Sequence, residues 1–241
     1  MLVLYRTKLY TEYEKSHIWR KVMKYVPVSS MGDMARRFEK MFSFDIWPYT
    51  TLCKFKAGEY LCRQGQAENK LYYVIKGRCK ILINQPNGKT SLVSYVQAPA
   101  FVGELEMLQS QKESHDVAAT SSVTAFVIDV SGCRKRLLQD VTFLQTLCIF
   151  FSQKTLQTSL AHSKNDSFRL EIRLADFILK NASHGIYSEP HTETCQFFGV
   201  SYRHLLYVIA DFVDKGYLQK QGRKYIIADK EGLLALAGEM D

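Results

Sequence analysis

The stretch that decides the fold is residues 190–228, PHTETCQFFGVSYRHLLYVIADFVDKGYLQKQGRKYIIA. It is typical of two helices that meet across a short turn and are followed by a two-stranded hairpin. The first helix is predicted at Thr192–Phe198, and Gly199 supplies the break because glycine tolerates the positive φ of a sharp helix stop. Ser201 is a suitable N-cap, since its hydroxyl can accept from the free N–H groups of a second helix at Tyr202–Lys215.

The second helix is predicted to bury one face. Its apolar residues recur at spacings of three and four, and they are Leu205, Leu206, Ile209, Phe212 and Val213. The small Cys195 is expected where the two helices approach each other closely. Gly216 is expected to end the second helix, and Gln221-Gly222 predicts the turn of the hairpin, or wing, that ends at Tyr225–Ile227.

A helix pair of this kind is a DNA-reading device whose second helix enters the major groove. The alternative is an αα-hairpin packed into an ordinary core, but the turn, the N-cap and the basic wing favour DNA. Arg203 is a candidate to pair with a guanine edge or a phosphate, whereas the tyrosines offer hydroxyls and stacking surface. The predicted DNA-binding residues are Thr192, Ser201, Tyr202, Arg203, His204, Tyr207, Lys220, Arg223 and Lys224.

The net charge of +8 is unevenly distributed along the 241 residues. Residues 1–64 carry a balance of +6 and residues 65–164 one of +4, whereas residues 165–241 carry −2. The predicted DNA-binding end is therefore the least basic part, which counts against DNA because phosphate neutralisation supplies much of the affinity. A local cluster of cations can still form a positive face, and a dimer would double it.

The composition predicts a soluble, cytoplasmic protein of one large or two ordinary domains. Hydrophobic residues make up 46% of the chain, enough to build real cores. The apolar runs fall short of the ~20 residues of a membrane helix, and Arg6 follows the N-terminus too soon for a secretory signal. The six cysteines form no CxxC pair, which fits reduced thiols better than a disulfide framework.

From about Thr51 to Asp129 the pattern changes to short strands separated by turns. Strands are predicted at 52–55, 60–62, 71–75, 79–83, 91–96 and 122–128, with a firm hairpin signal at Pro86-Asn87-Gly88. A polar stretch follows FVGE (101–104). Several short strands at roughly ten-residue spacing predict a sandwich, barrel or jelly roll.

Residues 133–163 are predicted to be helical, with an apolar surface too wide to be covered on one side only. Phe143, Leu147 and Phe150 form one stripe, expected to pack on the β domain. The other stripe is expected to pack against a second copy of the chain, and it consists of Val141, Leu144, Cys148 and Phe151. Asn165–Ser167 is predicted as a hinge and N-cap before an amphipathic helix at Phe168–Lys180.

These patterns divide the chain into four parts. Residues 1–42 are an extension of unknown role, with helical stretches predicted at 12–25 and 34–41. Residues 43–132 are the β-roll, residues 133–164 the helical region with the dimerisation helix, and residues 165–241 the winged helix-turn-helix. The predicted class is α+β.

Four runs carry a more specific resemblance: GEYLCRQG (58–65), LYYVIKGRCKI (71–81), FVGELEML (101–108) and GVSYRHLLYVIADFVDKGYL (199–218). With the order of roll, long helix and winged helix-turn-helix, they resemble the CRP/FNR family of bacterial transcription regulators over about residues 45–238. The 200–218 run, the preceding HTETC and the GLLALAGEMD tail look close to the YeiL branch.

The resemblance implies a double-stranded β-helix, or jelly roll, of the cyclic-nucleotide-binding type. It also implies a homodimer that binds double-stranded DNA at half-sites roughly 34 Å apart, with RNA polymerase as a further partner and no membrane. A signal would act by shifting the angle between roll and winged helix about a hinge near Ser163–Ser167.

In cyclic-nucleotide-binding members of the family, a Gly-Glu pair contacts the ribose, and an Arg followed by Ser or Thr grips the phosphate. Gly103 and Glu104 stand at the first pair, but Ser114 and His115 fall where the second is expected, followed by the acidic Asp116. We therefore expect no tight cyclic AMP binding. An effector pocket, if formed, would involve Gly103, Glu104, Leu105, Ser114 and His115; the alternative for Glu104 is a loop carboxylate that pairs locally.

No cofactor is predicted. An iron–sulfur cluster needs about four converging thiolates, and Cys53, Cys62, Cys79 and Cys133 lack the tight spacing of the family's cluster motif. A thiol redox switch between Cys53 and Cys62 is the next alternative, and ordinary buried cysteines are the favoured interpretation.

Two other function classes compete with DNA binding. A metalloenzyme on a cupin-like roll needs clustered histidine and carboxylate ligands, but of the histidines at 17, 115, 162, 184, 191 and 204 only one falls inside the roll. We therefore predict no catalytic residue, no metal site and no enzyme. A regulatory nucleotide-binding module that acts on a partner protein is the alternative function, and the winged helix-turn-helix argues against it.

Overall fold

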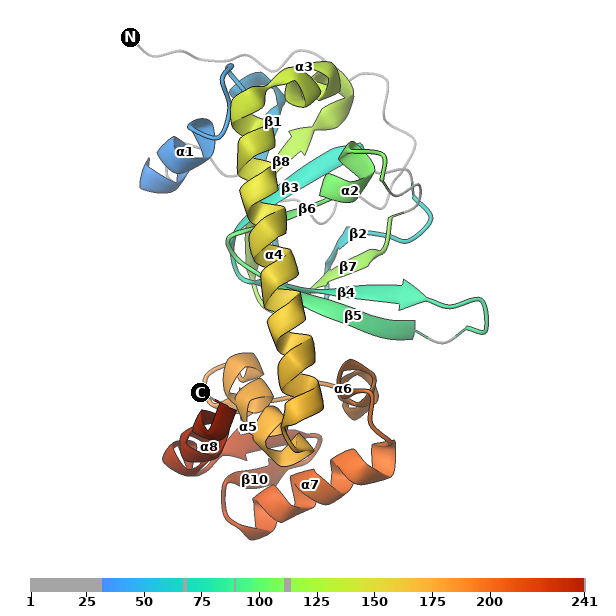
Figure 1. Ribbon diagram of the computed structural model, residues 1–241, viewed down its shortest axis with the longest axis vertical. Coiled ribbons are helices and arrows are strands. Elements are labelled where there is room, and N and C mark those ends of the chain that lie inside the picture. Colours follow the sequence, from blue (N-terminus) through green and yellow to red (C-terminus); the bar gives the residue numbers. More distant parts are fainter. Residues whose placement is uncertain (1–31, 67–68, 89, 111–113, 241) are drawn as a thin grey trace. The chain divides into compact units, whose positions relative to one another are not determined.

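The computed structural model describes residues 32–66, 69–88, 90–110 and 114–240. The helix predicted at 12–25 lies outside the described residues. Two compact units divide the chain, namely Met1–Cys79 with Val96–Lys135, and Lys80–Tyr95 with Arg136–Asp241 (Figure 1). Each unit is built around its own core.

The first described elements of the first unit are α1 (Gly32–Glu39) and a short 3-10 helix at Trp47–Tyr49. Its main sheet has the order β1-β8-β3-β6, formed by β1 (Thr50–Phe55), β8 (Val123–Asp129), β3 (Lys70–Lys76) and β6 (Ala100–Val102). All three pairings are antiparallel, and β1 runs against β8 from Thr50↔Ile128 to Phe55↔Val123.

A second sheet has the order β2-β7-β4-β5. Here β2 (Tyr60–Cys62) pairs with β7 (Asp116–Ala119), and β4 (Arg78–Asn84) leads into β5 (Thr90–Gln97). The residue after β7, Thr120, donates its backbone N–H to the carbonyl of Arg78 at the start of β4, over 2.9 Å. The short helix α2 (Glu104–Met107) follows β6.

Aromatic side chains dominate the core of the first unit. The rings of Phe38 and Phe126 stack with centroids 4.5 Å apart, and Trp47 meets Phe126 edge-on at 5.6 Å. The fully buried Tyr72 keeps its hydroxyl satisfied by donating to the Leu61 carbonyl over 2.7 Å. Because Phe38 is fully buried, α1 is anchored to the β-sheet core rather than lying free at its edge.

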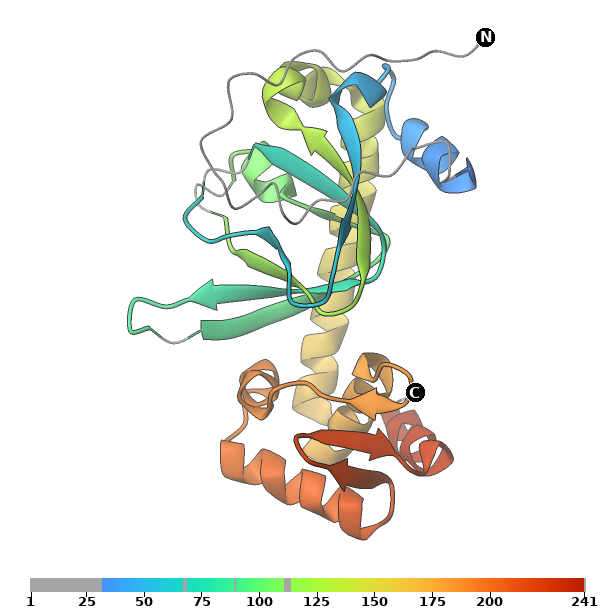
Figure 2. The same ribbon diagram turned by 180° about the vertical axis from the view of Figure 1, so that it is seen from behind.

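The second unit is largely helical. It contains most of α3 (Arg134–Gln139) and the long α4 (Val141–Ser167), followed by α5 (Leu170–Asn181). The strand β9 (Ile186–Tyr187) precedes α6 (His191–Phe198) and α7 (Tyr202–Asp214), and the wing strands are β10 (Leu218–Gln221) and β11 (Lys224–Ile227). The last helix is α8 (Lys230–Ala237); Figure 2 shows the wing strands in red beside the orange α7.

The three strands β10-β11-β9 form a small antiparallel sheet under these helices. The core between them buries one side of α5, α6 and α7 together with Tyr187, Tyr225 and Leu233. The Tyr187 hydroxyl lies 3.0 Å from that of the fully buried Thr194, whose hydroxyl also donates to the Pro190 carbonyl. This pair satisfies the buried polar groups and ties β9 to α6.

The β4–β5 residues of the second unit also contact α6. Lys80 Nζ lies 2.6 Å from Glu193 Oε2, in a pair whose side chains are only 18% and 20% exposed. The Leu92 N–H donates to Gln196 Oε1 over 3.1 Å. Tyr95 packs its ring edge-on against Phe177 and Phe197, with centroids 5.6 and 5.7 Å away. Residues 80–95 therefore contribute packing to the second unit.

Most predicted elements are confirmed, and two predictions are wrong. The N-cap predicted at Asn165–Ser167 lies within α4, which ends at Ser167; α5 begins at Leu170 after Arg169, which makes no side-chain cap. Leu206 does not lie on the buried face of α7 but is 37% exposed, and Val208 is buried instead. The sequence pattern also missed the helices α2 and α8 and the strands β6, β7 and β9.

Candidate nucleic-acid interface

The turn between α6 and α7 has the predicted caps. Gly199 ends α6 in the left-handed region at φ 65°, and the following Val200 N–H donates to the Cys195 carbonyl over 3.0 Å. Ser201 caps α7, because its hydroxyl accepts from the His204 N–H over 3.2 Å. Cys195 is buried in the core of the second unit. These local contacts fix where α6 ends and where α7 begins.

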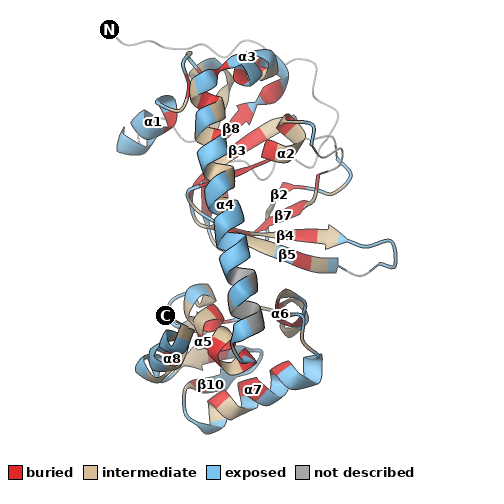
Figure 3. Cartoon of the chain, viewed as in Figure 1, coloured by how far each residue is buried: buried red, intermediate tan, exposed pale blue. Residues whose placement is uncertain are grey.

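The outward face of α7 carries most of the predicted DNA-binding side chains. Tyr202 is 50% exposed and Tyr207 71% exposed, and Ser201, Arg203 and His204 are exposed with them. The opposite face is buried in the core through Leu205, Val208, Ile209 and Phe212. Figure 3 shows this division along α7, buried on one side and exposed on the other.

The remaining predicted residues lie on α6 and the wing. Thr192, in the first turn of α6, is exposed. On the wing, Lys220 and Lys224 belong to the paired strands β10 and β11, and Arg223 lies in the turn between them; all three are exposed. The structure thus carries these cations on a hairpin of the same unit as α7.

His191 joins this region although the sequence did not single it out. Its ring centroid lies 5.7 Å from that of Tyr225 on β11 and 6.2 Å from that of Tyr202 on α7. Burial and the nearby Lys220 ammonium lower the pKa of His191 below its usual value. No periodic pattern marks such a contact, because it joins three elements that come together only in the folded domain.

Leu206 is a residue that the sequence pattern misassigned to the buried face of α7. It lies one turn after Tyr202 and Arg203 on α7, and its side chain is 37% exposed. The 3–4 spacing placed it with the core residues because its neighbour Leu205 is buried. Only the packing of α7 on its own domain distinguishes the two leucines.

The predicted effector residues lie around β6, α2 and β7 of the first unit. Gly103 has φ +87°, and a Cβ there would come within 2.5 Å of the Lys70 carbonyl oxygen, so only glycine fits. Glu104 and Ser114 are buried, whereas Leu105 and His115 are half-buried. Ser114 Oγ has no hydrogen-bond partner among the described residues.

A second buried carboxylate adjoins this region. Asp116 Oδ1 accepts from the Gln64 N–H over 2.7 Å, and the Ser114 carbonyl accepts from the Gly65 N–H over 3.3 Å. The 64–65 turn is thereby held against the start of β7. Glu104 and Asp116 are thus two buried carboxylates in the predicted effector region of the first unit.

The four cysteines considered for iron or redox chemistry are all buried, and they are thiols rather than disulfides. Cys53 lies on β1 and Cys62 on β2, in different sheets. Burial raises the pKa of the Cys53 thiol to about 11 and that of Cys79 to about 12, which disfavours the reactive thiolate. Within the described ranges, no three His, Cys, Asp or Glu residues are grouped so as to hold a metal ion.

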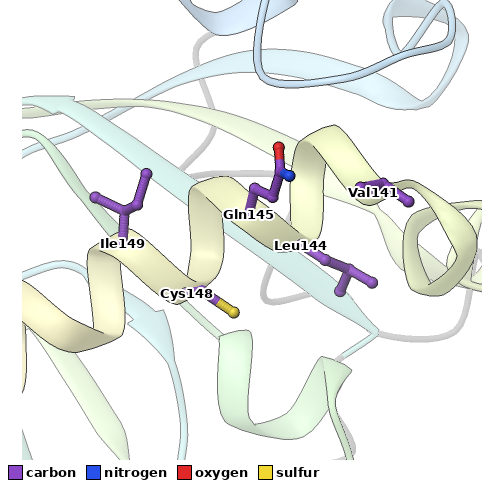
Figure 4. Close-up of a pocket in the computed structure, with 5 residues that line it drawn as sticks. All are labelled: Val141, Leu144, Gln145, Cys148 and Ile149. Atoms are coloured by element: carbon purple, nitrogen blue, oxygen red, sulfur yellow. The ribbon is translucent and has the colours of Figure 1, made fainter.

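The two apolar stripes of α4 differ in exposure. Phe143 and Leu147 are buried and Phe150 is half-buried, whereas Val141 is 65% exposed. Of the other predicted dimer residues, Cys148 is exposed and Leu144 and Phe151 are half-buried. Figure 4 shows the five residues of this helix that line a shallow pocket, namely Val141, Leu144, Gln145, Cys148 and Ile149. No helix in the described part of the chain is long and apolar enough to span a membrane.

Comparison with known proteins identifies the family. Residues 52–140 match the cyclic nucleotide-binding domain family. Over 204 residues the chain is 36% identical to the regulatory protein YeiL of Escherichia coli O157:H7, which covers 85% of this chain and 93% of that relative. The chain belongs to the CRP/FNR family.

Solved structures of CRP/FNR proteins share the fold. One from Thermus thermophilus superimposes with a TM-score of 0.63 at 20% identity, covering 79% of this chain and 100% of that one. Another, from Eubacterium rectale, has a TM-score of 0.67 at 14% identity and covers 89% and 99%. The predicted fold class and family are confirmed, and the protein is a transcriptional regulator of the CRP/FNR type.

Proposed function

We propose that this CRP/FNR protein is a homodimer that binds double-stranded DNA sequence-specifically through α7. The exposed face of α7 carries the proposal, because Tyr202, Arg203 and Tyr207 project from a helix whose opposite face is buried. A recognition helix presents the residues of its first turns to base edges in the major groove. Arg203 has the donor geometry for a bidentate contact to guanine.

The wing supports this arrangement electrostatically. Lys220, Arg223 and Lys224 are exposed on the β10–β11 hairpin, while residues 165–241 as a whole carry a balance of −2. Phosphate contacts position a protein on the duplex, whereas base contacts specify the sequence. We therefore assign phosphate contacts to the wing cations and to Thr192, and base contacts to the α7 face.

The test is selection of duplexes from a random library by the full-length protein, followed by affinity measurements on the enriched operator. Arg203→Ala should lower operator affinity by about 10- to 100-fold, the effect of one lost bidentate base contact, and relax the preference at one position per half-site. Lys180→Ala is the matched control. It removes one positive charge paired with Asp176 on α5 and should leave sequence preference unchanged.

Two results would contradict the proposal. If no duplex is enriched, the chain is better explained as a regulatory module that acts on a partner protein. If Arg203→Ala binds the operator as well as the wild type does, Arg203 is not a base reader. As a regulator of this type, the protein is further expected to work in the cytoplasm with RNA polymerase.

We also propose that the β-roll does not bind cyclic AMP tightly. A cyclic phosphate needs a cationic clamp, but Ser114 and His115 stand at the clamp positions, and Glu104 and Asp116 are buried carboxylates of the same unit. Bringing a phosphate near such carboxylates is electrostatically unfavourable. Calorimetric titration with cyclic AMP should give no binding at micromolar concentrations, and micromolar affinity would overturn this assignment.

A further inference from the structure

Leu206 is an apolar side chain on the face of α7 that carries polar groups. Residues three and four apart are neighbours on a helix surface, so Leu206 adjoins Arg203 and Tyr202 on one side and Ala210 on the other. All four are exposed, and Leu206 retains 37% of its surface. The core of the second unit is complete without it, because the buried residues of α7 are Leu205, Val208, Ile209 and Phe212.

The surroundings limit what can cover this leucine. The same unit exposes the guanidinium of Arg203 and the wing cations Lys220, Arg223 and Lys224. Leu206 and its neighbour Arg203 combine an apolar side chain with a cation on one helix face, which is complementary to a polyanion that offers an apolar group. In the major groove, the 5-methyl group of thymine is that group, and apolar side chains contact it.

We propose that Leu206 contacts the 5-methyl group of a thymine in each half-site and so determines specificity at that position. This inference rests on the proposed function, since it requires α7 to lie in the major groove. The contact is distinct from hydrogen-bond readout by Arg203, because it distinguishes thymine through a methyl group alone. Burial of one methyl-sized group corresponds to about a fourfold change in affinity.

The test uses the operator selected from random duplexes by the wild-type protein. Each thymine is replaced in turn by deoxyuridine, which removes the methyl group and leaves every hydrogen-bonding group in place. We expect one position per half-site at which the wild type loses about fourfold in affinity per substitution. Leu206→Ala should bind more weakly than the wild type and should no longer distinguish thymine from deoxyuridine at that position.

Two further variants make the result specific. Leu206→Met keeps an apolar side chain and should retain the thymine preference. Leu234→Ala removes a leucine of α8 that is 50% exposed in the same unit, and it should behave as the wild type. Circular dichroism of each variant should match the wild type, because the substituted side chains lie outside the buried core.

Failure of the inference and failure of the proposed function give different results. If an operator is selected but deoxyuridine is tolerated at every position, Leu206 reads no methyl group. The inference is equally overturned if deoxyuridine at that position weakens the binding of Leu206→Ala as much as it weakens the binding of the wild type. If no operator is selected at all, DNA binding itself is wrong, and a protein partner must cover this face.

Discussion

Two glycines with the same backbone angle allow a test at the scale of single residues. Gly58 and Gly103 both have φ +87°, but a Cβ on Gly58 would meet nothing within 4 Å, whereas one on Gly103 would lie 2.5 Å from the Lys70 carbonyl oxygen. Gly58→Ala should therefore cost only the left-handed strain, about 1 kcal/mol. Gly103→Ala should cost about 3 kcal/mol or more, because β3 must also move away from the new methyl group.

Urea and thermal unfolding of the two variants measure this difference. Gly58→Ala is the control, since it carries the same conformational strain without the close approach. The order of stability should be wild type, then Gly58→Ala, then Gly103→Ala. Equal losses in the two variants would mean that the turn after β6 does not approach β3 as closely as described.

Single residues were predictable where their role is local. Ser201 and Gly199 were assigned correctly from residue type and spacing, because an N-cap and a left-handed C-cap depend on a few neighbouring residues. Leu206 was assigned wrongly, since leucines at adjacent positions satisfy the same 3–4 pattern. His191 was missed because its ring contacts come from α7 and β11.

At the scale of elements, the hydrophobic pattern of a segment decided whether the sequence predicted its helix or strand. The run at 71–75 is rich in aromatic and β-branched residues, and it forms β3 as predicted. The strand β7 follows a polar stretch and begins with Asp116, so its four residues gave no alternating signal although all four are buried. Pairing with β2, which is remote in sequence, supplies what the local pattern lacks.

The error in the predicted N-cap has a similar cause. Asn165, Asp166 and Ser167 are residues that favour N-caps, but they also occur inside helices, and here they form the last turn of α4. Neither glycine nor proline interrupts this part of the sequence, and α4 continues to Ser167. Cap-type residues indicate a helix start only when a break accompanies them, as Gly199 does before Ser201.

At the scale of the whole molecule, the exposed apolar surface of α4 is the feature that most needs an explanation. This 27-residue helix buries Phe143 and Leu147, yet it exposes large apolar side chains that the described part of its own chain leaves uncovered. They are Val141 at 65%, Ile149 at 59%, Leu156 at 60% and Leu160 at 54% exposure. An exposed apolar stripe of this length on a helix is typical of an interface with another chain, and Figure 3 shows the exposed surface along α4.

If a second copy covers this stripe, a charge within it should separate the copies. We expect the wild type to have twice the 27.8 kDa mass of the chain in sedimentation equilibrium at micromolar concentration, and the double variant Val141→Glu, Cys148→Glu to be monomeric. Burying unpaired carboxylates costs several kcal/mol, more than such an interface tolerates. Gln153→Glu, at an exposed polar position of the same helix, is the control and should remain dimeric.

Because a monomer reaches only one half-site, the double variant should bind an operator with two half-sites no more tightly than it binds a single half-site. A double variant that is still dimeric would exclude α4 as the interface.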